Sequence, residues 1–392
     1  MRKFLMFFCM VLLGSMMVFA GGASDKSSIP NSKAIRIGWF GPLSGAAAEV
    51  GVNGLNAVKV AIKQINQNGG IMGKELDLIP YDDSGNYETS VKVVTRLIQQ
   101  DKIIGIVGSH LSSSVLAASD STEKAKIVMF GTGTSSIWTN IGLKYTFRGT
   151  ACSDLFNKGA YDAMCKMNAK RIATICGDTE YAQTCTKNIW AFVTKNPDMK
   201  IVASESWTTG DSDYSGQLIK IVNAKPDALY IVGGGEDVGK VIAQARQQGY
   251  EGYIYGVEPF ADTNAMKMAG SAFENCIFGC AYFIPASIDQ AQTDVEKNFL
   301  TAYRAMFNQL PTAEVAYRAY DSMMLLAKAI EKAKSLDGDA IRAAVLKLSY
   351  KGIGGDFNFS SDTGEGLSVA HVYIYADGRH QDFYKWLAAS KK

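Results

Sequence analysis

The sequence predicts an α/β protein that contains two parallel sheets, each covered by helices on both faces. Short apolar strands alternate with helical stretches along the first part of the chain, and the same rhythm restarts near residue 171. Such alternation is typical of parallel sheets, because a crossover helix must carry the chain back before the next parallel strand begins. We expect two sheets because a single one would be very wide.

The elements follow in a regular order. The strands are expected at 34–40, 75–82, 103–108, 126–130, 171–178, 200–207, 227–233, 253–258 and 274–283, and short strands return between 357 and 384. The helices are expected at about 54–67, 87–100, 178–194, 236–248, 295–308 and 313–334. In the last of these, Met323, Leu326, Ala327 and Ile330 form one apolar stripe, which we interpret as core.

The first 20 residues read as a secretory signal peptide, because Arg2 and Lys3 precede an uncharged apolar run that ends in Ala20. A membrane anchor is the alternative, but a spanning helix needs roughly 20 apolar residues and this run is shorter. Residues 21–32 are expected to form a linker. No cysteine follows the cleavage point to take a lipid, so we expect no membrane anchor after cleavage, and we infer a periplasmic location.

The charge balance argues against a nucleic-acid binder. The chain has 40 Lys and Arg against 38 Asp and Glu, and two of the basic residues lie in the signal peptide, so the mature chain is neutral. A protein that binds along phosphates needs an excess of basic residues. Only three histidines occur, at 110, 371 and 380, and none has ligand spacing with a cysteine pair, so no metal site is expected.

Six cysteines remain after the signal peptide: Cys152, Cys165, Cys176, Cys185, Cys276 and Cys280. In an oxidising compartment an even number suggests disulfides, while buried free thiols are the alternative, and the sequence leaves both open. Cys276 and Cys280 share a predicted strand, which separates them by about 13 Å, so they should not pair with each other unless the strand bends.

Ligands of open α/β sheets bind beyond the carboxyl ends of the strands, so the turns there are the candidate sites. Neither the turn at 41–45 nor the glycines at 233–235 have the G-x-G-x-x-G spacing of a dinucleotide site, and no cofactor is expected. The turn after 103–108 carries His110 and Ser112 into a helix, whose first N–H groups can hold a carboxylate. A serine-capped helix without a ligand is the alternative.

Two further turns extend this site. Residues 131–136 are small and rich in hydroxyls, which permits close backbone approach and hydrogen bonding to an anion. In the second half of the chain, Tyr181 opens a helix, and Glu258 precedes Pro259, so we expect Glu258 to project from the strand end in extended geometry rather than join a helix. Donors in one half and an acid with an aromatic in the other suit a zwitterion held between them.

The order of these residues resembles that of the branched-chain amino-acid (leucine/isoleucine/valine-type) solute-binding proteins of ABC transporters. The resemblance covers nearly all of the chain from Ile35. It is carried by PLSGAAAEVG at 42–51, INQNGGIMGKEL at 65–76, YDD at 81–83, VGSHLSSS at 107–114, FRGT at 147–150, QARQQG at 244–249 and YGVE at 255–258.

This resemblance implies a type I periplasmic binding protein-like fold, in which a hinge of three chain crossings joins two doubly wound lobes. Lobe I would take residues 33–153 and 283–369, and lobe II residues 154–282 and 370–392. The resemblance also implies that Ser112, Ser135 and the backbone around Gly133 hold a ligand carboxylate. Glu258 would meet the ligand ammonium, with Tyr181 closing from lobe II.

Four positions of a possible side-chain pocket depart from the family pattern. Gly234 and Val315 stand where aromatic residues often lie, Val50 replaces a tyrosine, and His110 replaces an apolar residue. Gly85 and Leu111 occupy the positions of a cysteine pair that often links two loops. These departures put leucine itself in doubt, so an amide, a urea-like solute or a small carboxylate remains an alternative ligand.

Two classes of function therefore compete. The first is a monomeric, non-catalytic receptor that closes on an amino acid and delivers it to a membrane permease, or presents it to a chemoreceptor. The second is an exported serine hydrolase. The sequence favours the receptor, because it has no G-x-S-x-G elbow and only His110 lies near a candidate serine.

Overall fold

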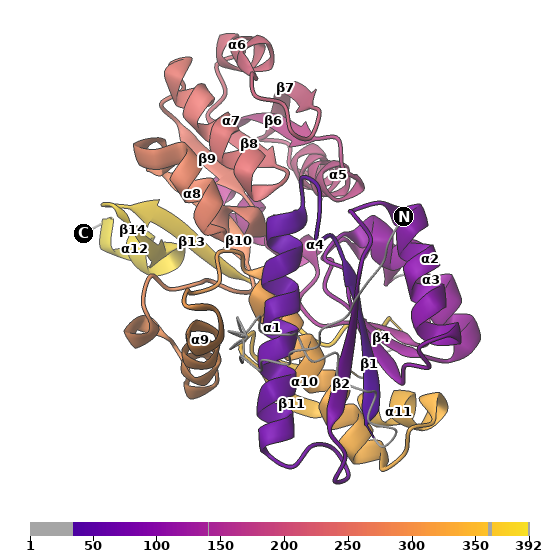
Figure 1. Cartoon of the computed structure of the whole chain (residues 1–392). Helices are drawn as coiled ribbons and strands as arrows, with labels where there is room; N and C mark the ends of the chain where they lie inside the picture. The colour runs from indigo at the N-terminus through magenta and orange to yellow at the C-terminus, as the bar shows by residue number, and fades with distance from the viewer. Residues whose placement is uncertain (1–33, 140, 360–362, 391–392) are drawn as a thin grey trace, which may run out of the picture. The chain divides into compact units, whose positions relative to one another are not determined.

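The computed structural model describes residues 34–139, 141–359 and 363–390, and residues 33–392 form one compact unit. Its first sheet has five parallel strands in the order β2-β1-β3-β4-β5 (Figure 1). They are β1 Ile35–Gly41, β2 Leu76–Asp82, β3 Gly105–Gly108, β4 Val128–Gly131 and β5 Thr146–Arg148. This doubly wound order reverses direction between β1 and β3, and ligands bind at such a switch point.

Helices cover both faces of this sheet, because apolar side chains alternate along its strands. On β1, Ile35 and Ile37 pack with residues of α1 and α10, whereas Phe40 packs with residues of α2 and α3. The helices are α1 Ala48–Gln67, α2 Tyr87–Gln99, α3 Ser112–Ala125, α9 Asp294–Phe307, α10 Val315–Ala333 and α11 Gly338–Val345. We call this sheet and its helices the first lobe.

The second sheet has seven strands in the order β14-β13-β10-β9-β8-β6-β7, and β13 alone runs antiparallel to its neighbours β10 and β14. The strands are β6 Arg171–Gly177, β7 Lys200–Trp207, β8 Ala228–Val232, β9 Tyr253–Gly256, β10 Cys276–Cys280, β13 His371–Ala376 and β14 Arg379–Asp382. The five parallel strands repeat the winding order of the first sheet.

This sheet is also covered on both faces. Helices α4 and α5 pack with one set of alternating strand residues, and α6, α7 and α8 pack with the other set. Their bounds are α4 Ser153–Lys166, α5 Glu180–Lys195, α6 Ser215–Asn223, α7 Gly235–Gln247 and α8 Thr263–Ala269. Helix α12, Phe383–Ser390, packs on β13. We call this sheet and its helices the second lobe.

The chain passes between the sheets three times. It crosses from β5 to α4, from β10 to α9, and from the hairpin of β11 Ser349–Lys351 and β12 Asp356–Asn358 to β13. Four short 3-10 helices complete the fold: η1 Ser136–Trp138, η2 Glu258–Ala261, η3 Gly270–Phe273 and η4 Ile288–Gln290. The predicted α/β class with two parallel-sheet lobes is confirmed. The predicted lobe boundaries stay a prediction.

Helix α1 begins at Ala48, six residues before the predicted start near residue 54. Its glycines allow close packing there, and they do not end the helix. A Cβ on Gly51 would clash with the carbonyl oxygen of Pro42, and one on Gly54 would lie 3.8 Å from the Cβ of Ala319 on α10. The predicted stripe of α10 is confirmed as core, since Met323, Leu326, Ala327 and Ile330 are all buried.

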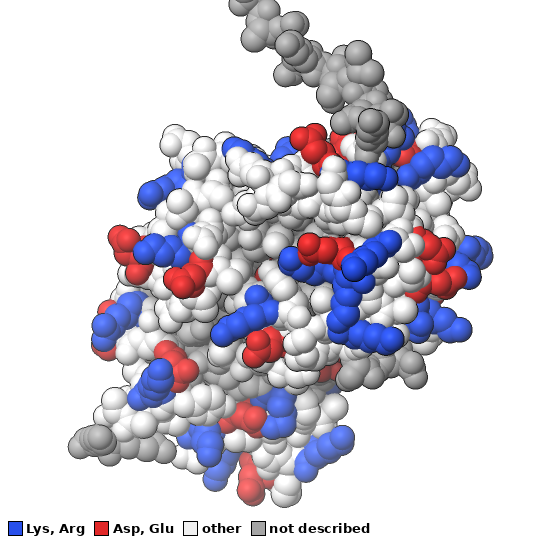
Figure 2. Space-filling model, turned by 90° about the horizontal axis from the view of Figure 1, so that it is seen from below, with Lys and Arg blue, Asp and Glu red and all other residues white. Residues whose placement is uncertain are grey.

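The signal peptide and the linker at 21–32 lie outside the described residues, so they stay predictions. Within the described ranges, no helix is long and apolar enough to span a membrane. Figure 2 shows Lys and Arg side chains interspersed with Asp and Glu side chains on the face that it presents.

Candidate functional site

The candidate ligand-binding residues of the first lobe meet where β3 and β4 end. The amide of Ser135 donates to Ser112 Oγ at 3.2 Å. Gly133 lies so close to Ser112 that a Cβ at position 133 would be 2.7 Å from Ser112 Oγ, which explains why only glycine fits. Ser112, Gly133 and Ser135, predicted separately from two turns, are therefore one cluster at the switch point of the sheet.

Main-chain donors surround this cluster. Helix α3 begins at Ser112 itself, and its N-cap residue is Leu111, whose side chain makes no capping bond. The expectation that a serine caps this helix is wrong, because the serines lie one position too far along the chain. The first N–H groups of a helix have no carbonyl within it to bond. Among the described residues, the amides of Gly133 and Thr134 also have no hydrogen-bond acceptor.

The second lobe contributes Glu258, which is 2% exposed. Its Oε1 accepts a hydrogen bond from Thr134 Oγ1 of the first lobe at 2.5 Å. Its Oε2 is buried and has no partner among the described residues. The prediction of an extended Glu258 is wrong, because Glu258 is the first residue of η2. Pro259 permits this, since proline is tolerated in the first turn of a helix.

Tyr181, the second residue of α5, supplies another unpaired group of this lobe. Its hydroxyl is buried without a hydrogen-bond partner in the described part of the chain. Burial, followed by the negative charge of Glu258 and a side-chain interaction with its carboxylate, raises the pKa of Tyr181 well above its usual value. The phenol therefore stays protonated, and it faces the Glu258 carboxylate.

Glu180, next to Tyr181, was not predicted as a site residue. Its Oε1 accepts a hydrogen bond from Ser135 Oγ at 3.0 Å, and its Oε2 is buried without a described partner. Thr134 donates to Glu258 in the same way. Two consecutive residues of the first lobe therefore each bond an acidic side chain of the second lobe. The sequence signal that could have found Glu180 is its place beside Tyr181, after a strand end.

Arg318 of α10 is a second residue that sequence reasoning missed. It is 6% exposed, and it forms an ion pair with Glu314 and donates to the carbonyl oxygen of Thr132 at 3.1 Å. Its Nη2 lies 3.7 Å from Glu258 Oε1.

Asp262 is a buried acid beside this group. It accepts a hydrogen bond from the amide of Glu314, and burial raises the pKa of Asp262 to about 8, although the charge of Arg318 acts to lower it.

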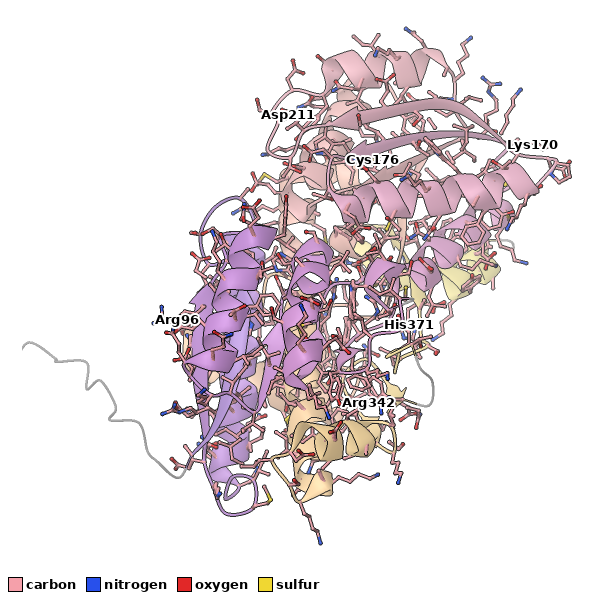
Figure 3. The ribbon with its side chains drawn as sticks, turned by 90° about the vertical axis from the view of Figure 1, so that its right-hand side faces the viewer. Arg96, Lys170, Cys176, Asp211, Arg342 and His371 are labelled. Atoms are coloured by element: carbon pink, nitrogen blue, oxygen red, sulfur yellow. The ribbon has the colours of Figure 1, made fainter. Side chains whose placement is uncertain are left out.

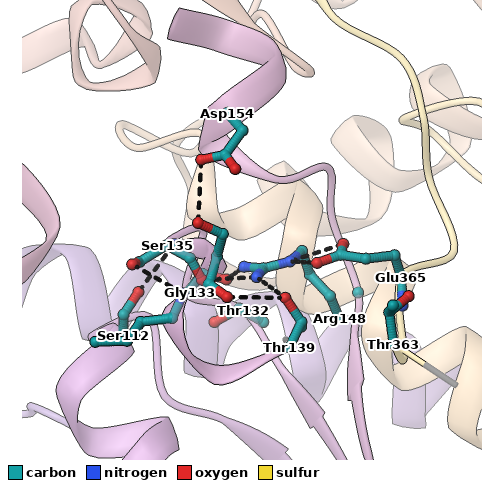
Figure 4. A network of polar contacts seen from close by, with 12 residues as sticks. Ser112, Thr132, Gly133, Ser135, Thr139, Arg148, Asp154, Thr363 and Glu365 are labelled. Atoms are coloured by element: carbon teal, nitrogen blue, oxygen red, sulfur yellow. Dashed lines mark hydrogen bonds and ion pairs between the residues drawn. The ribbon is translucent and has the colours of Figure 1, made fainter. Parts of the chain in front are cut away.

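Arg148 of β5 holds the loop that carries Gly133 and Ser135 (Figure 4). This arginine is fully buried. It donates to the carbonyl oxygens of Gly133 and Ser135 and forms an ion pair with Glu365. The sequence placed it only within the family stretch FRGT and assigned it no role. A buried cation that binds main-chain carbonyls leaves no residue pattern of its own in the sequence.

The four pocket positions differ in their surroundings. Val315 is buried at the start of α10, and its Cγ2 lies 4.0 Å from the position of a Cβ on Gly54. Gly234 is exposed at the N-cap of α7 and borders open space. His110 is half-buried, and burial, followed by the charge of Arg318, lowers its pKa to about 3. Val50 lies half-buried in the first turn of α1.

The six cysteines of the described chain are free thiols, and four of them are buried. Cys276 and Cys280 lie in one strand and do not pair, as predicted. Figure 3 shows Cys176 in the second lobe, where it lines a hollow of about 330 Å³ beside α5, together with Trp190. Within the described residues, no cluster of His, Cys, Asp and Glu side chains suits a metal ion.

Two doubly wound lobes whose hydrogen-bonding side chains meet, as Thr134 and Ser135 of the first lobe meet Glu258 and Glu180 of the second, are the architecture of a two-lobed solute receptor. The model of the periplasmic binding protein family matches residues 34–377, and the chain belongs to this family.

Two named relatives have similar sequences over most of their length. A leucine-, isoleucine-, valine-, threonine- and alanine-binding protein of Pseudomonas aeruginosa is 26% identical over 345 residues, which cover 88% of this chain and 89% of the relative. A Leu/Ile/Val-binding protein of Citrobacter freundii is 26% identical over 337 residues, covering 84% and 89%.

Solved structures share the fold. The branched-chain amino-acid transporter substrate-binding protein LivJ of Streptococcus pneumoniae, in complex with isoleucine, has a TM-score of 0.80 and 26% identity. The match covers 89% of this chain and 98% of that one. An ABC transporter solute-binding protein of R. palustris, in complex with benzoate, has a TM-score of 0.79 and 18% identity, over 89% and 95% of the two chains.

Proposed function

We propose that this protein is the periplasmic solute-binding component of an ABC importer and that it binds an α-amino acid in the cleft between its lobes. In this role it needs no cofactor. It closes on the solute, delivers it to a membrane permease and releases it unaltered. The solute stabilises the closed form only through its greater affinity for that form.

The observation that carries this proposal is a group of unpaired buried atoms on the second lobe, to which Glu180 Oε2 also belongs. Glu258 Oε2 and the Tyr181 hydroxyl have no partner among the described residues. An unsatisfied buried polar group costs about 1 to 3 kcal/mol, and a charged one costs more. A bound ammonium would satisfy the Glu258 carboxylate and neutralise its charge.

The opposite end of the ligand suits the first lobe. The uncapped start of α3 and the unpaired amides of Gly133 and Thr134 offer main-chain donors, and the partial positive charge of a helix N-terminus favours an anion. A carboxylate bonded there and an ammonium bonded to Glu258 would each have a partner. Burying a zwitterion requires partners at both ends.

Two comparisons support an amino acid as the ligand. The P. aeruginosa relative is named for five amino acids, and the S. pneumoniae structure holds isoleucine. Each shares about a quarter of its residues with this chain over most of its length. The side chain of the amino acid stays open, because the pocket positions 50, 110, 234 and 315 depart from the family pattern.

A serine hydrolase is disfavoured by the chemistry of His110. A general base works best when its pKa lies near the working pH. Burial keeps the pKa of His110 at about 3, and no hydrogen bond joins His110 to a serine among the described residues. His110 is therefore a poor base for activating Ser112 or Ser113.

The position of Arg318 favours a second candidate ligand, an amide or small carboxylate without an ammonium. The guanidinium lies 3.7 Å from Glu258 Oε1 and would repel a neighbouring ammonium. Two unit charges 4 Å apart interact by about 4 kcal/mol at an effective dielectric constant of about 20. The ion pair with Glu314 offsets much of this repulsion, which is why the amino acid remains the leading candidate.

A thermal-shift panel tests the proposal. It contains the twenty amino acids, amides, sugars and short-chain carboxylic acids. A ligand at 100 times its Kd should stabilise the folded protein by about 2.7 kcal/mol. A response to one or a few amino acids, with the solute recovered unaltered, supports the proposal. A response to sugars alone contradicts it, and a response to amides or small acids alone supports the second candidate.

A further inference from the structure

Arg148 lies in the interior of the first lobe, behind the loop that carries Gly133 and Ser135 (Figure 4). It is the last residue of β5, pairs in register with Gly131 and is 0% exposed. Its guanidinium stacks on the ring of Trp138 at 4.1 Å. A cation buried this deeply must have its donors satisfied, so its contacts show which groups it holds in place.

Each nitrogen of the guanidinium has a partner. Nη1 donates to the carbonyl oxygen of Gly133, and Nη2 donates to the carbonyl oxygen of Ser135 at 2.7 Å and to Thr139 Oγ1 at 3.1 Å. Nε donates to the two carboxylate oxygens of Glu365 at 3.0 and 2.9 Å. The planar fork thus holds two alternate carbonyls of one loop and the acid of another segment at once.

These bonds determine where the loop amides point. In a trans peptide the C=O and the following N–H point in opposite directions. Because the carbonyl of Gly133 is turned toward Arg148, the amide of Thr134 is turned away from it. That amide has no acceptor among the described residues, and the hydroxyl of the same residue reaches Glu258 across the cleft.

Glu365 connects this arrangement to the hinge. It lies on the third crossing, between β12 and β13, and the amide of Arg148 also donates to the carbonyl oxygen of Gly364 on that crossing at 2.9 Å. Three residues farther along each segment, Ala151 and Leu367 form a parallel bridge. The crossing is therefore bonded to β5 through both main chain and side chain.

We propose that Arg148 is a positioning residue for the ligand's anionic group: by holding the carbonyl of Gly133 it orients the unpaired main-chain donor of Thr134 away from the lobe interior, and Glu365 on the hinge crossing fixes the orientation of Arg148. This inference rests on the proposed function, because it assumes a carboxylate at that loop. Arg148 does not touch the ligand. It acts through the loop, so its loss should weaken the binding of a carboxylate more than the binding of a neutral group at the same place.

Arg246 provides a matched control in the second lobe. It too holds main-chain carbonyls with a guanidinium, those of Tyr250, Gly252 and Glu274, and its guanidinium lies 5.6 Å from the ring of Tyr250. None of these partners is a candidate site residue. Arg246→Met should therefore lower stability without changing ligand affinity, which separates a general structural effect from a positioning effect.

The experiment measures binding by calorimetry with L-leucine, L-threonine and L-alanine, and with the carboxamide of each. The carboxamides keep the ammonium and lack the carboxylate. In Arg148→Lys and Arg148→Met, we expect amino-acid binding to fall about 10- to 100-fold, because donors displaced by an ångström lose most of their hydrogen bond. Binding of the carboxamides should fall less, and Arg246→Met should change neither.

Glu365→Gln is the milder variant. It keeps an acceptor for Nε and removes the charge that fixes Arg148, so we expect a smaller loss of the same kind, even if the Arg148 variants do not fold. If the Arg148 and Glu365 variants weaken acids and amides equally, or match Arg246→Met, the inference is wrong while the proposed function stands. If the wild-type protein binds none of the three amino acids or their amides, the inference falls together with the amino-acid proposal.

Discussion

We call the candidate residues of each lobe a wall of the site. The side chains of the two walls differ in how far their polar atoms are satisfied within the protein, whereas the first wall keeps unpaired main-chain amides. On the first-lobe wall, the side chains of Ser112 and Ser135 have bonding partners within the protein, and Arg148 fixes the loop between them. On the second-lobe wall, Glu258 and Tyr181 each keep a buried polar atom without a partner among the described residues.

The two walls therefore have different roles in ligand binding. The first wall is preorganised, so it contributes neutral donors whose geometry is already set, and a ligand that binds there loses little by ordering it. The second wall carries a buried acid, Glu258, whose Oε1 is already bonded by Thr134 and lies near Arg318 and whose Oε2 gains a partner only on binding. The first wall therefore selects by shape and hydrogen-bond direction, whereas the second selects by charge.

The largest expected effect comes from removing the charge of the second wall. Glu258→Gln should weaken amino-acid binding by about 2 to 5 kcal/mol, because the carboxylate is buried and its ammonium partner would lose a counter-charge. Isothermal titration calorimetry measures the loss. Tyr253→Phe, on the β9 strand that precedes η2 and outside the candidate site, is the control. Unchanged affinity in Glu258→Gln would remove the ammonium role.

A smaller effect is expected from the backbone of the first wall. Gly133→Ala should cost about 1 to 3 kcal/mol in stability or binding, because its Cβ would lie 2.7 Å from Ser112 Oγ and overpack the loop. Urea unfolding with and without ligand separates the two contributions. Gly216→Ala is the control, because a Cβ at position 216 would meet open space. Gly142→Ala would strain the backbone, since Gly142 has a φ of +80°. Wild-type behaviour of Gly133→Ala would show that the loop adapts.

Removing one hydroxyl of the first wall should cost less. Ser112→Ala takes away the acceptor of the Ser135 amide and leaves the main-chain donors of α3 in place, so we expect a loss of about 0.5 to 1.5 kcal/mol in ligand binding. Calorimetry on this variant beside Glu258→Gln tests the comparison directly. If Ser112→Ala cost more than Glu258→Gln, the charged wall would not dominate selection.

The smallest effect concerns pH. His110 has a pKa lowered from 6.5 to about 3, so it stays neutral between pH 5 and 7 and its charge should not change ligand affinity there. Stability behaves differently. The unfolded chain takes up a proton near pH 6.5 that the folded site resists, so the contribution of His110 is present above pH 6.5 and is lost as pH falls toward 3. His110→Leu should reduce this dependence in pH-dependent unfolding, and an unchanged slope would contradict it.

Much of the fold could be predicted because its signals are local. Alternating strands and helices indicate parallel sheets, and the restart near residue 171 indicated the second one. The start of α1 was missed, since Gly51 and Gly54 look like helix breakers until their close contacts with Pro42 and α10 are known. Tertiary contacts explain these glycines, whereas hydrophobic periodicity in the sequence reports only local structure.

The candidate site divides in the same way. Ser112, Gly133, Ser135, Tyr181 and Glu258 follow strand ends, so position pointed to the turns that carry them, and the family resemblance singled out these residues. Their roles stay predictions. Arg148 and Arg318 could not be found, because each acts through partners far away in the chain, Glu365 in one case and Thr132 in the other. Only the folded chain brings these pairs together.

The antiparallel pairing of β13 with β10 has a consequence for biogenesis. Strand β10 pairs with residues 371–376, which follow it only after α9, α10 and α11, so one side of β10 lacks its neighbour until those residues have been synthesised. Contacts of such long sequence separation form late in folding. A nascent chain stopped before β13 would expose an unpaired strand edge, a shape that invites aggregation and suits recognition by chaperones.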